Sequence, residues 1–135
     1  MGKIDESCKQ VVDKVDGGVA CGVVDLDTGM LLGIHNASVY TQTLNEVVAA
    51  ATMDLFRGAN VGRIEQMVRS HRGEQETGEH YFQEIHVTSA NNFHFMKTIK
   101  GGKAVIVLVT KKSTNIGMGW AQLKSVIPDV EPLVP

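Results

Sequence analysis

The sequence predicts an α+β domain: a five-stranded antiparallel sheet with helices on both faces. Apolar residues recur at helical spacing near the start, in the middle and near the end of the 135-residue chain, and apolar, β-branched runs separated by turn residues lie between them. Two of these runs, residues 19–27 and 103–110, are apolar at consecutive positions. Such a strand is covered on both faces, so we expect both runs at the centre of the sheet.

Composition narrows the class of protein. Apolar residues make up 43% of the chain and charged residues 21%, and the net charge is −2 without a basic cluster, which argues against nucleic-acid binding. No apolar run reaches the roughly 18 residues of a membrane span, and the first ten residues do not resemble a secretion signal. Cys8 and Cys21 are predicted to be small buried residues of a cytoplasmic protein. We expect one domain over residues 1–135, with a core at 3–128 and a tail at 129–135.

The first elements are a helix and a hairpin. Residues 3–16 place one apolar stripe on a helix that ends at Gly17 and Gly18; the stripe consists of Ile4, Cys8, Val11, Val12 and Val15. Residues 19–27 and 30–36 then read as two strands joined by a tight turn.

That turn contains Asp27-Thr28-Gly29, the triplet found in each half-site of an aspartic protease. A protease loop needs a small residue after the glycine, because it packs beneath paired carboxylates, whereas Met30 follows here. A hairpin needs only an Asp that begins the turn and a Gly that accepts a positive φ. We therefore interpret the triplet as a turn, and we predict no catalytic residue.

From about Thr43 the apolar spacing is helical, and it forms two stripes. One stripe consists of Leu44, Val47, Val48, Ala51 and Leu55, and the other, nearly opposite, of Ala49, Met53 and Phe56. A helix with two apolar faces needs two coverings. One is the helix's own sheet, and we assign Ala49, Met53 and Phe56 to a partner chain. The alternative is that another part of the same chain covers them.

A shorter helix is expected to follow, capped by Asn60, and residues 71–80 form a polar loop. Residues 81–89, 93–99 and 103–110 are predicted strands joined by hairpins, and residues 113–127 a final helix that Pro128 ends. With strands numbered along the chain, the two central strands impose the sheet order 2-1-5-4-3.

Strand 81–89 is then an edge without proline, whose free N–H and C=O groups can pair with another chain. One of its faces carries Phe82, Glu84, His86 and Thr88. The register with the next strand stays open: a two-residue loop of Ala90 and Asn91 places Phe95 beside His86, and a three-residue loop places it beside Val87.

Other candidate sites are weak. His86 and His94 are possible cross-strand neighbours, but no third ligand completes a metal site, so neither metal nor cofactor is predicted. Gly117 and Gly119 at the start of the last helix follow two lysines and suggest an anion site, but the spacing of a phosphate loop is absent. We expect instead that these glycines let the helix approach the sheet closely.

The segments ACGVVDLDTGMLLG and AVIVLVTKKSTNIGMGWAQL resemble the first hairpin and the last strand and helix of the roadblock family, which includes dynein light chains and small-GTPase regulators. The resemblance covers roughly residues 3–128, and the order of elements is similar too. Segment 60–80 and the proline-containing tail depart from the family pattern. The fold implied is roadblock-like or profilin-like.

The resemblance implies a non-enzymatic role. Members of the family form homodimers, or heterodimers with a paralogue, by joining edge strands and packing their long second helices together. These dimers bind Ras-like GTPases or motor complexes. We therefore predict a dimeric interaction module with an interface at Ala49, Met53, Phe56, Phe82, Glu84, His86 and Thr88. The alternative is a small-molecule sensor of profilin-like or PAS-like architecture, since sheets flanked by helices can open an apolar pocket.

Overall fold

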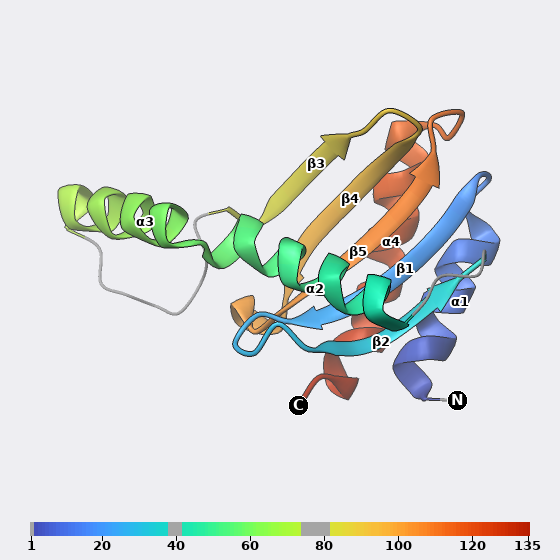
Figure 1. Cartoon of the computed structure of the whole chain (residues 1–135), viewed down its shortest axis with the longest axis horizontal. Helices are drawn as coiled ribbons and strands as arrows, with labels where there is room; N and C mark the ends of the chain where they lie inside the picture. The colour runs from blue at the N-terminus through green and yellow to red at the C-terminus, as the bar shows by residue number, and fades with distance from the viewer. Residues whose placement is uncertain (1, 38–41, 74–81) are drawn as a thin grey trace.

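The computed structural model of the chain describes residues 2–37, 42–73 and 82–135 (Figure 1). Its five strands form one antiparallel sheet in the order β2-β1-β5-β4-β3, as predicted. The elements in chain order are α1 (Lys3–Lys14), β1 (Gly18–Asp25), β2 (Leu31–Asn36), α2 (Gln42–Arg57), α3 (Ala59–Arg72), β3 (Glu84–Thr88), β4 (Asn92–Ile99), a 3₁₀ turn η1 (Lys100–Gly102), β5 (Ala104–Lys111), α4 (Ile116–Val130) and a 3₁₀ turn η2 (Glu131–Leu133).

Helices cover both faces of the sheet, which explains the unbroken apolar runs of β1 and β5. The first face, called here the α1/α4 face, lies under α1 and α4, and the second, the α2 face, lies under α2 (Figure 1). Successive strand residues enter opposite cores: Val23 and Ile106 pack in the α1/α4 core, whereas Val24 and Val105 pack in the α2 core. The sheet is thus the middle layer of three.

The α1/α4 face holds the larger core. The stripe predicted for the first helix packs there, and Cys8 and Cys21 are free and buried, as predicted. A hydrogen bond that the Cys21 thiol donates to Cys8, together with burial, raises the pKa of Cys21 well above its ordinary value. A thiol with a raised pKa is a poor nucleophile, so Cys21 contributes packing rather than reactivity.

The start of α4 is fixed by a cap and a close contact. Asn115 caps the helix, because its Oδ1 accepts a hydrogen bond from the Met118 N–H at 3.0 Å. A Cβ at Gly119 would lie 2.6 Å from the Phe95 ring. The prediction that a glycine lets this helix approach the sheet is confirmed for Gly119.

Two predictions about the C-terminus are wrong. Pro128 lies inside α4, which continues to Val130, so the proline does not end the helix. Residues 129–135 are also no loose tail, because Val130 and Val134 are buried in the α1/α4 core and Glu131 accepts a hydrogen bond from the Lys100 N–H at 2.7 Å. Burial of these two valines explains why the chain keeps folding past Pro128.

The register of β3 and β4 is resolved in favour of the two-residue loop. His86 pairs with Phe95 and Val87 with His94, and the Ser89 N–H donates to the Asn92 carbonyl at 2.9 Å. Since paired residues share a face, His86 and His94 lie on opposite faces of the sheet and are not cross-strand neighbours. In the described chain no group of three or more His, Cys, Asp or Glu side chains could hold a metal ion.

The helical segment after α2 starts earlier than predicted. Gly58 is the N-cap residue of α3, and Asn60, the predicted cap, lies within the helix. Tyr81 and most of the predicted loop at 71–80 lie outside the described residues. Among the described helices, none combines the length and the apolar character needed to cross a membrane.

Candidate partner interface

The two apolar stripes of α2 have the opposite roles from those predicted. Ala49 and Phe56 are 1% and 0% exposed, and both pack against the sheet in the α2 core. Thr52, one turn from each, is buried with them. The prediction that Ala49 and Phe56 face a partner is therefore wrong. The stripe that contains Phe56 packs against the sheet, because burying its large aromatic ring removes more apolar surface from water than burying a valine.

Met53 lies between the two stripes and is partly buried. Its sulfur lies against the β1–β2 turn, since a Cβ added at Gly29 would come within 2.9 Å of it. Met53 thus packs on its own chain at the margin of the helix rather than at the centre of an outer face.

The outer stripe of α2 is exposed. Val48 is 50% and Leu55 42% exposed, two turns apart on the same side, with Ala51 exposed between them. The side chains of Leu44 and Val47, predicted for this stripe, lie outside what the structure describes. An apolar row at this spacing on a solvent-facing helix is typical of a surface that packs on another helix.

Helix α3 carries further exposed apolar side chains. It projects away from the sheet beyond the start of β3 (Figure 1). Ile64 and Met67, one turn apart, are 46% and 66% exposed. We call Val48, Ala51, Leu55, Ile64 and Met67 the outer row. It is the largest set of exposed apolar helical side chains in the described chain.

The edge of the sheet near α3 is β3, which pairs only with β4 among the described strands. Its Glu84, His86 and Thr88 belong to the α1/α4 face. The His86 ring centroid lies 5.1 Å from that of Phe95, and the Glu84 carboxylate lies 3.1 Å from Lys124 on α4. These predicted interface residues therefore cannot share a seam with Ala49 and Phe56, which lie on the opposite face.

Glu84 is held by two lysines. Its carboxylate lies 3.1 Å from the Lys124 nitrogen and 3.4 Å from the Lys97 nitrogen. The hydrogen bond from Lys124, assisted by Lys97, lowers the pKa of Glu84 below its ordinary value. Phe82, which precedes β3, is partly buried and makes contacts of its own. Glu84, His86, Thr88 and Phe82 remain predicted interface residues of the β3 edge.

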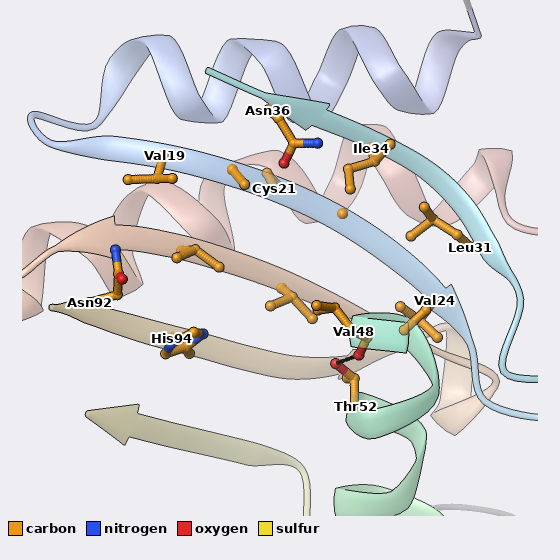
Figure 2. Close-up of a pocket in the computed structure, with 15 residues that line it drawn as sticks. Val19, Cys21, Val24, Leu31, Ile34, Asn36, Val48, Thr52, Asn92 and His94 are labelled. Carbon is orange, nitrogen blue, oxygen red and sulfur yellow. Dashed lines mark hydrogen bonds between the residues drawn. The ribbon is translucent and has the colours of Figure 1, made fainter. Parts of the chain in front are cut away.

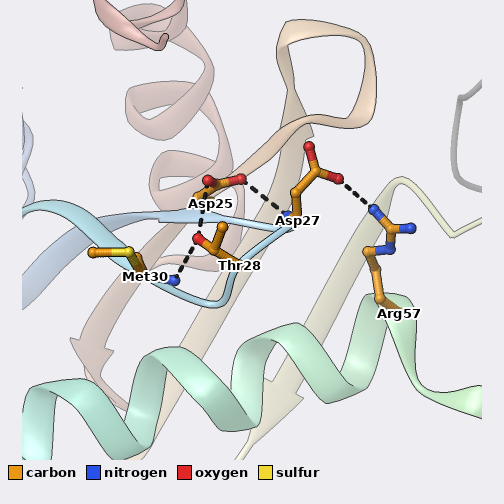
Figure 3. A network of polar contacts seen from close by, with 5 residues as sticks. All are labelled: Asp25, Asp27, Thr28, Met30 and Arg57. Atoms are coloured by element: carbon orange, nitrogen blue, oxygen red, sulfur yellow. Dashed lines mark hydrogen bonds and ion pairs between the residues drawn. The ribbon is translucent and has the colours of Figure 1, made fainter.

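The Asp27-Thr28-Gly29 triplet is a turn, as interpreted (Figure 3). Gly29 has φ +74°, and its N–H donates to the Asp25 carbonyl at 2.8 Å. The Asp25 carboxylate accepts from the Asp27 N–H and from the Thr28 hydroxyl, both at 3.0 Å. The Asp27 carboxylate lies 2.7 Å from Arg57 at the end of α2. The turn therefore helps to hold α2 across the sheet, with the outer row facing solvent.

No protein-family model and no curated protein matches the chain. Solved structures do match it. A roadblock/LC7 domain from Streptomyces avermitilis has a TM-score of 0.74, with 98% of each chain covered at 14% identity. The fold is a roadblock/LC7 fold. MglB of Myxococcus xanthus shares it with a TM-score of 0.70 at 18% identity, over 98% of this chain and 95% of its own.

The fold is also similar to that of profilin. Profilin IB of Acanthamoeba castellanii has a TM-score of 0.60 at 12% identity, over 96% of this chain and 98% of its own. Both parts of the predicted fold class, roadblock-like and profilin-like, are confirmed.

Proposed function

We propose that this protein is a non-enzymatic, cytoplasmic dimerisation module that regulates or scaffolds a Ras-like small GTPase or a motor complex. The observation that carries the proposal is the outer row of a roadblock fold, exposed beside β3, whose outer edge pairs with no other strand among the described residues. An apolar helix face next to an open strand edge gives a partner chain two adjoining ways to bind.

The dimer would join two β3 edges and bring the outer rows together. Pairing of edge strands uses the backbone groups that β3 leaves open, and packing of the outer rows buries Val48 and Leu55. Because α3 projects beyond the start of β3, Ile64 and Met67 are placed to extend the contact to the second protomer (Figure 1). The mate is a second copy of the chain or a paralogue.

Two features support a binding role rather than catalysis. Asp27, the carboxylate of the protease-like triplet, is engaged by Arg57 and lies on an exposed turn. The raised pKa of the buried Cys21 keeps that cysteine in the thiol form. The roadblock resemblance of the sequence implies the same role, because that family supplies a platform for GTPases and motor complexes rather than a catalytic residue.

The GTPase part of the proposal can be tested by affinity capture followed by an activity assay. The bait is the wild-type chain, and the control bait is Leu55→Glu, which places a charge in the outer row. We expect the wild type to capture a Ras-like GTPase and to change its rate of GTP hydrolysis when both proteins are purified, and the control to do neither. A wild-type dimer that captures no GTPase would contradict this part and leave the scaffold role.

A further inference from the structure

A groove of about 220 Å³ lies on the α2 face of the sheet, next to α2 (Figure 2). Its floor consists of Ala20 and Gly22 of β1 with Val107 and Val109 of β5. Val48 and Thr52 of α2 lie at one end of the groove. The Thr52 hydroxyl donates a hydrogen bond to the Val48 carbonyl at 2.9 Å. The lining is therefore mostly aliphatic.

The groove exists because small residues lie at its centre. A Cβ added at Gly22 would find its nearest neighbour, the Gly33 carbonyl oxygen, at 3.5 Å, which is an ordinary contact distance. Packing therefore does not require glycine here, in contrast to Gly119, where the same atom would overlap the Phe95 ring. Gly22 and Ala20 leave space that no described side chain fills.

The opposite end of the groove is polar and carries Asn92 and His94 of β4 (Figure 2). The Ser89 hydroxyl donates its one proton to the Asn92 carbonyl at 3.2 Å, so its oxygen accepts from Nε2–H of His94 at 3.1 Å. Nδ1 of a neutral His94 is then an acceptor. The Asn92 amide nitrogen donates to the Thr110 carbonyl at 3.1 Å, which leaves Oδ1 as a second acceptor.

The free polar atoms of Asn92 and His94 therefore both accept hydrogen bonds. Within the described residues, neither Nδ1 of His94 nor Oδ1 of Asn92 has a hydrogen-bond donor. Asn92 and His94 are two residues apart on one face, so their Cα atoms lie roughly 7 Å apart and both side chains border the same end of the groove. A ligand that matches this end must bring a donor, such as a hydroxyl or an N–H group.

The volume sets the size of the ligand. A cavity of about 150 Å³ holds benzene. A groove about half as large again suits a flat apolar body of roughly nine or ten non-hydrogen atoms. We infer that this groove binds a small, neutral, apolar molecule whose single hydrogen-bond donor faces Asn92 and His94. The inference does not require the proposed dimer, because the floor and the polar end of the groove lie on the sheet; among the lining residues, Val48 also belongs to the outer row.

The test uses two probes of nearly equal shape: indole, which has an N–H donor, and benzofuran, which has an oxygen in its place. Binding to the full chain is followed by the backbone amide NMR shifts of the groove floor. We expect both probes to move the amides of Gly22 and Val109, and indole to bind at least about fivefold more tightly than benzofuran.

Four variants locate the site, two of them controls. Gly22→Ala adds a methyl group to the floor and should weaken the binding of both probes by at least about threefold. Gly62→Ala on α3, where a Cβ meets open space, should change the affinity of neither probe. His94→Phe removes the acceptor and should bring the two affinities within about twofold of each other. His35→Phe, the matched control on the opposite face, should leave the preference for indole unchanged.

Several results would overturn the inference. Equal affinity of the two probes for the wild type would show that the acceptors do not select the ligand. Amide NMR shifts confined to other surfaces would show that the probes do not bind in the groove. Groove amides that move on dilution of the protein alone would show that a second copy occupies the groove instead. Because the comparison of probes on the wild type stands by itself, a variant that fails to fold does not protect the inference.

Discussion

Leu55 and Phe56 are consecutive residues of α2, roughly 100° apart around the helix, yet Phe56 is fully buried against the sheet and Leu55 is 42% exposed. This relationship assigns the two faces of the helix. The inner face belongs to the protein's own core, and the outer row is the surface open to a partner.

The first prediction separates these two residues by stability. Phe56→Ala should lower the free energy of unfolding by about 3–5 kcal/mol, because it removes a fully buried ring and leaves a cavity. Leu55→Ala should cost about 1 kcal/mol or less in the monomer. Urea denaturation at low protein concentration measures both, and similar losses for the two variants would contradict the assignment of the faces.

The second prediction concerns the contact between α4 and the sheet. Gly119→Ala should destabilise the protein by about 1–3 kcal/mol, because the added carbon would lie 2.6 Å from the Phe95 ring. Gly62→Ala, in open space on α3, should instead stabilise it by roughly 0.5–1 kcal/mol through helix propensity. Thermal denaturation of both variants provides the check, and a neutral Gly119→Ala would mean that α4 packs less closely.

The third prediction is a pH dependence from His94. Burial, with a smaller effect of His86, lowers the pKa of His94 below its ordinary value of 6.5. The unfolded chain therefore binds a proton at a higher pH than the folded chain does, and stability falls as the pH decreases from 6.5 to the folded pKa. NMR titration of the imidazole and denaturation across this range test it.

The control for this dependence is His94→Phe. In this variant the free energy of unfolding should change less between pH 6.5 and the folded pKa of His94, because the contribution of His94 is lost. The contributions of other titrating groups should remain. A His94 imidazole that titrates at or above pH 6.5 in the folded protein would contradict the prediction.

The fourth prediction concerns the ion pair of Asp27 and Arg57. Both side chains are largely exposed, 62% for Asp27 and 41% for Arg57, so the coupling should be only about 0.2–1 kcal/mol. A double-mutant cycle with Asp27→Asn and Arg57→Gln measures it. Since Asp27 has a structural role in the turn, Asp27→Asn should also leave partner binding intact, and its loss would assign Asp27 a further role.

Much of the fold could be predicted from sequence because the strands carry two-sided patterns. The continuous apolar runs of β1 and β5 identified them as central, and the sheet order followed from the hairpins. The turn at Gly29 was also predictable, because it depends on local chemistry. The end of α4 was not, since burial of Val130 and Val134 overrides the local signal of Pro128.

The interface was harder to predict, because periodicity shows that α2 has two apolar stripes but not which one faces the sheet. The choice depends on the ring of Phe56 and on the core residues it meets, Val24 and Met96, which are far away in sequence. The position of Thr52 beside Ala49 and Phe56 gave no usable signal, because a buried threonine interrupts an apolar stripe. The groove depends on Gly22, which the sequence shows only as an ordinary strand glycine.

The most direct measurement of the central claim is the mass of the chain in solution by sedimentation equilibrium. Wild-type protein at micromolar concentration should sediment at twice the chain mass of 14.6 kDa, and Leu55→Glu at 14.6 kDa with its circular dichroism unchanged. A control charge on the helix surface away from the outer row, Gln66→Glu, should leave the dimer intact. Wild-type protein that sediments at 14.6 kDa across this range, or a Leu55→Glu variant that keeps the doubled mass, would contradict a dimer formed through the outer row.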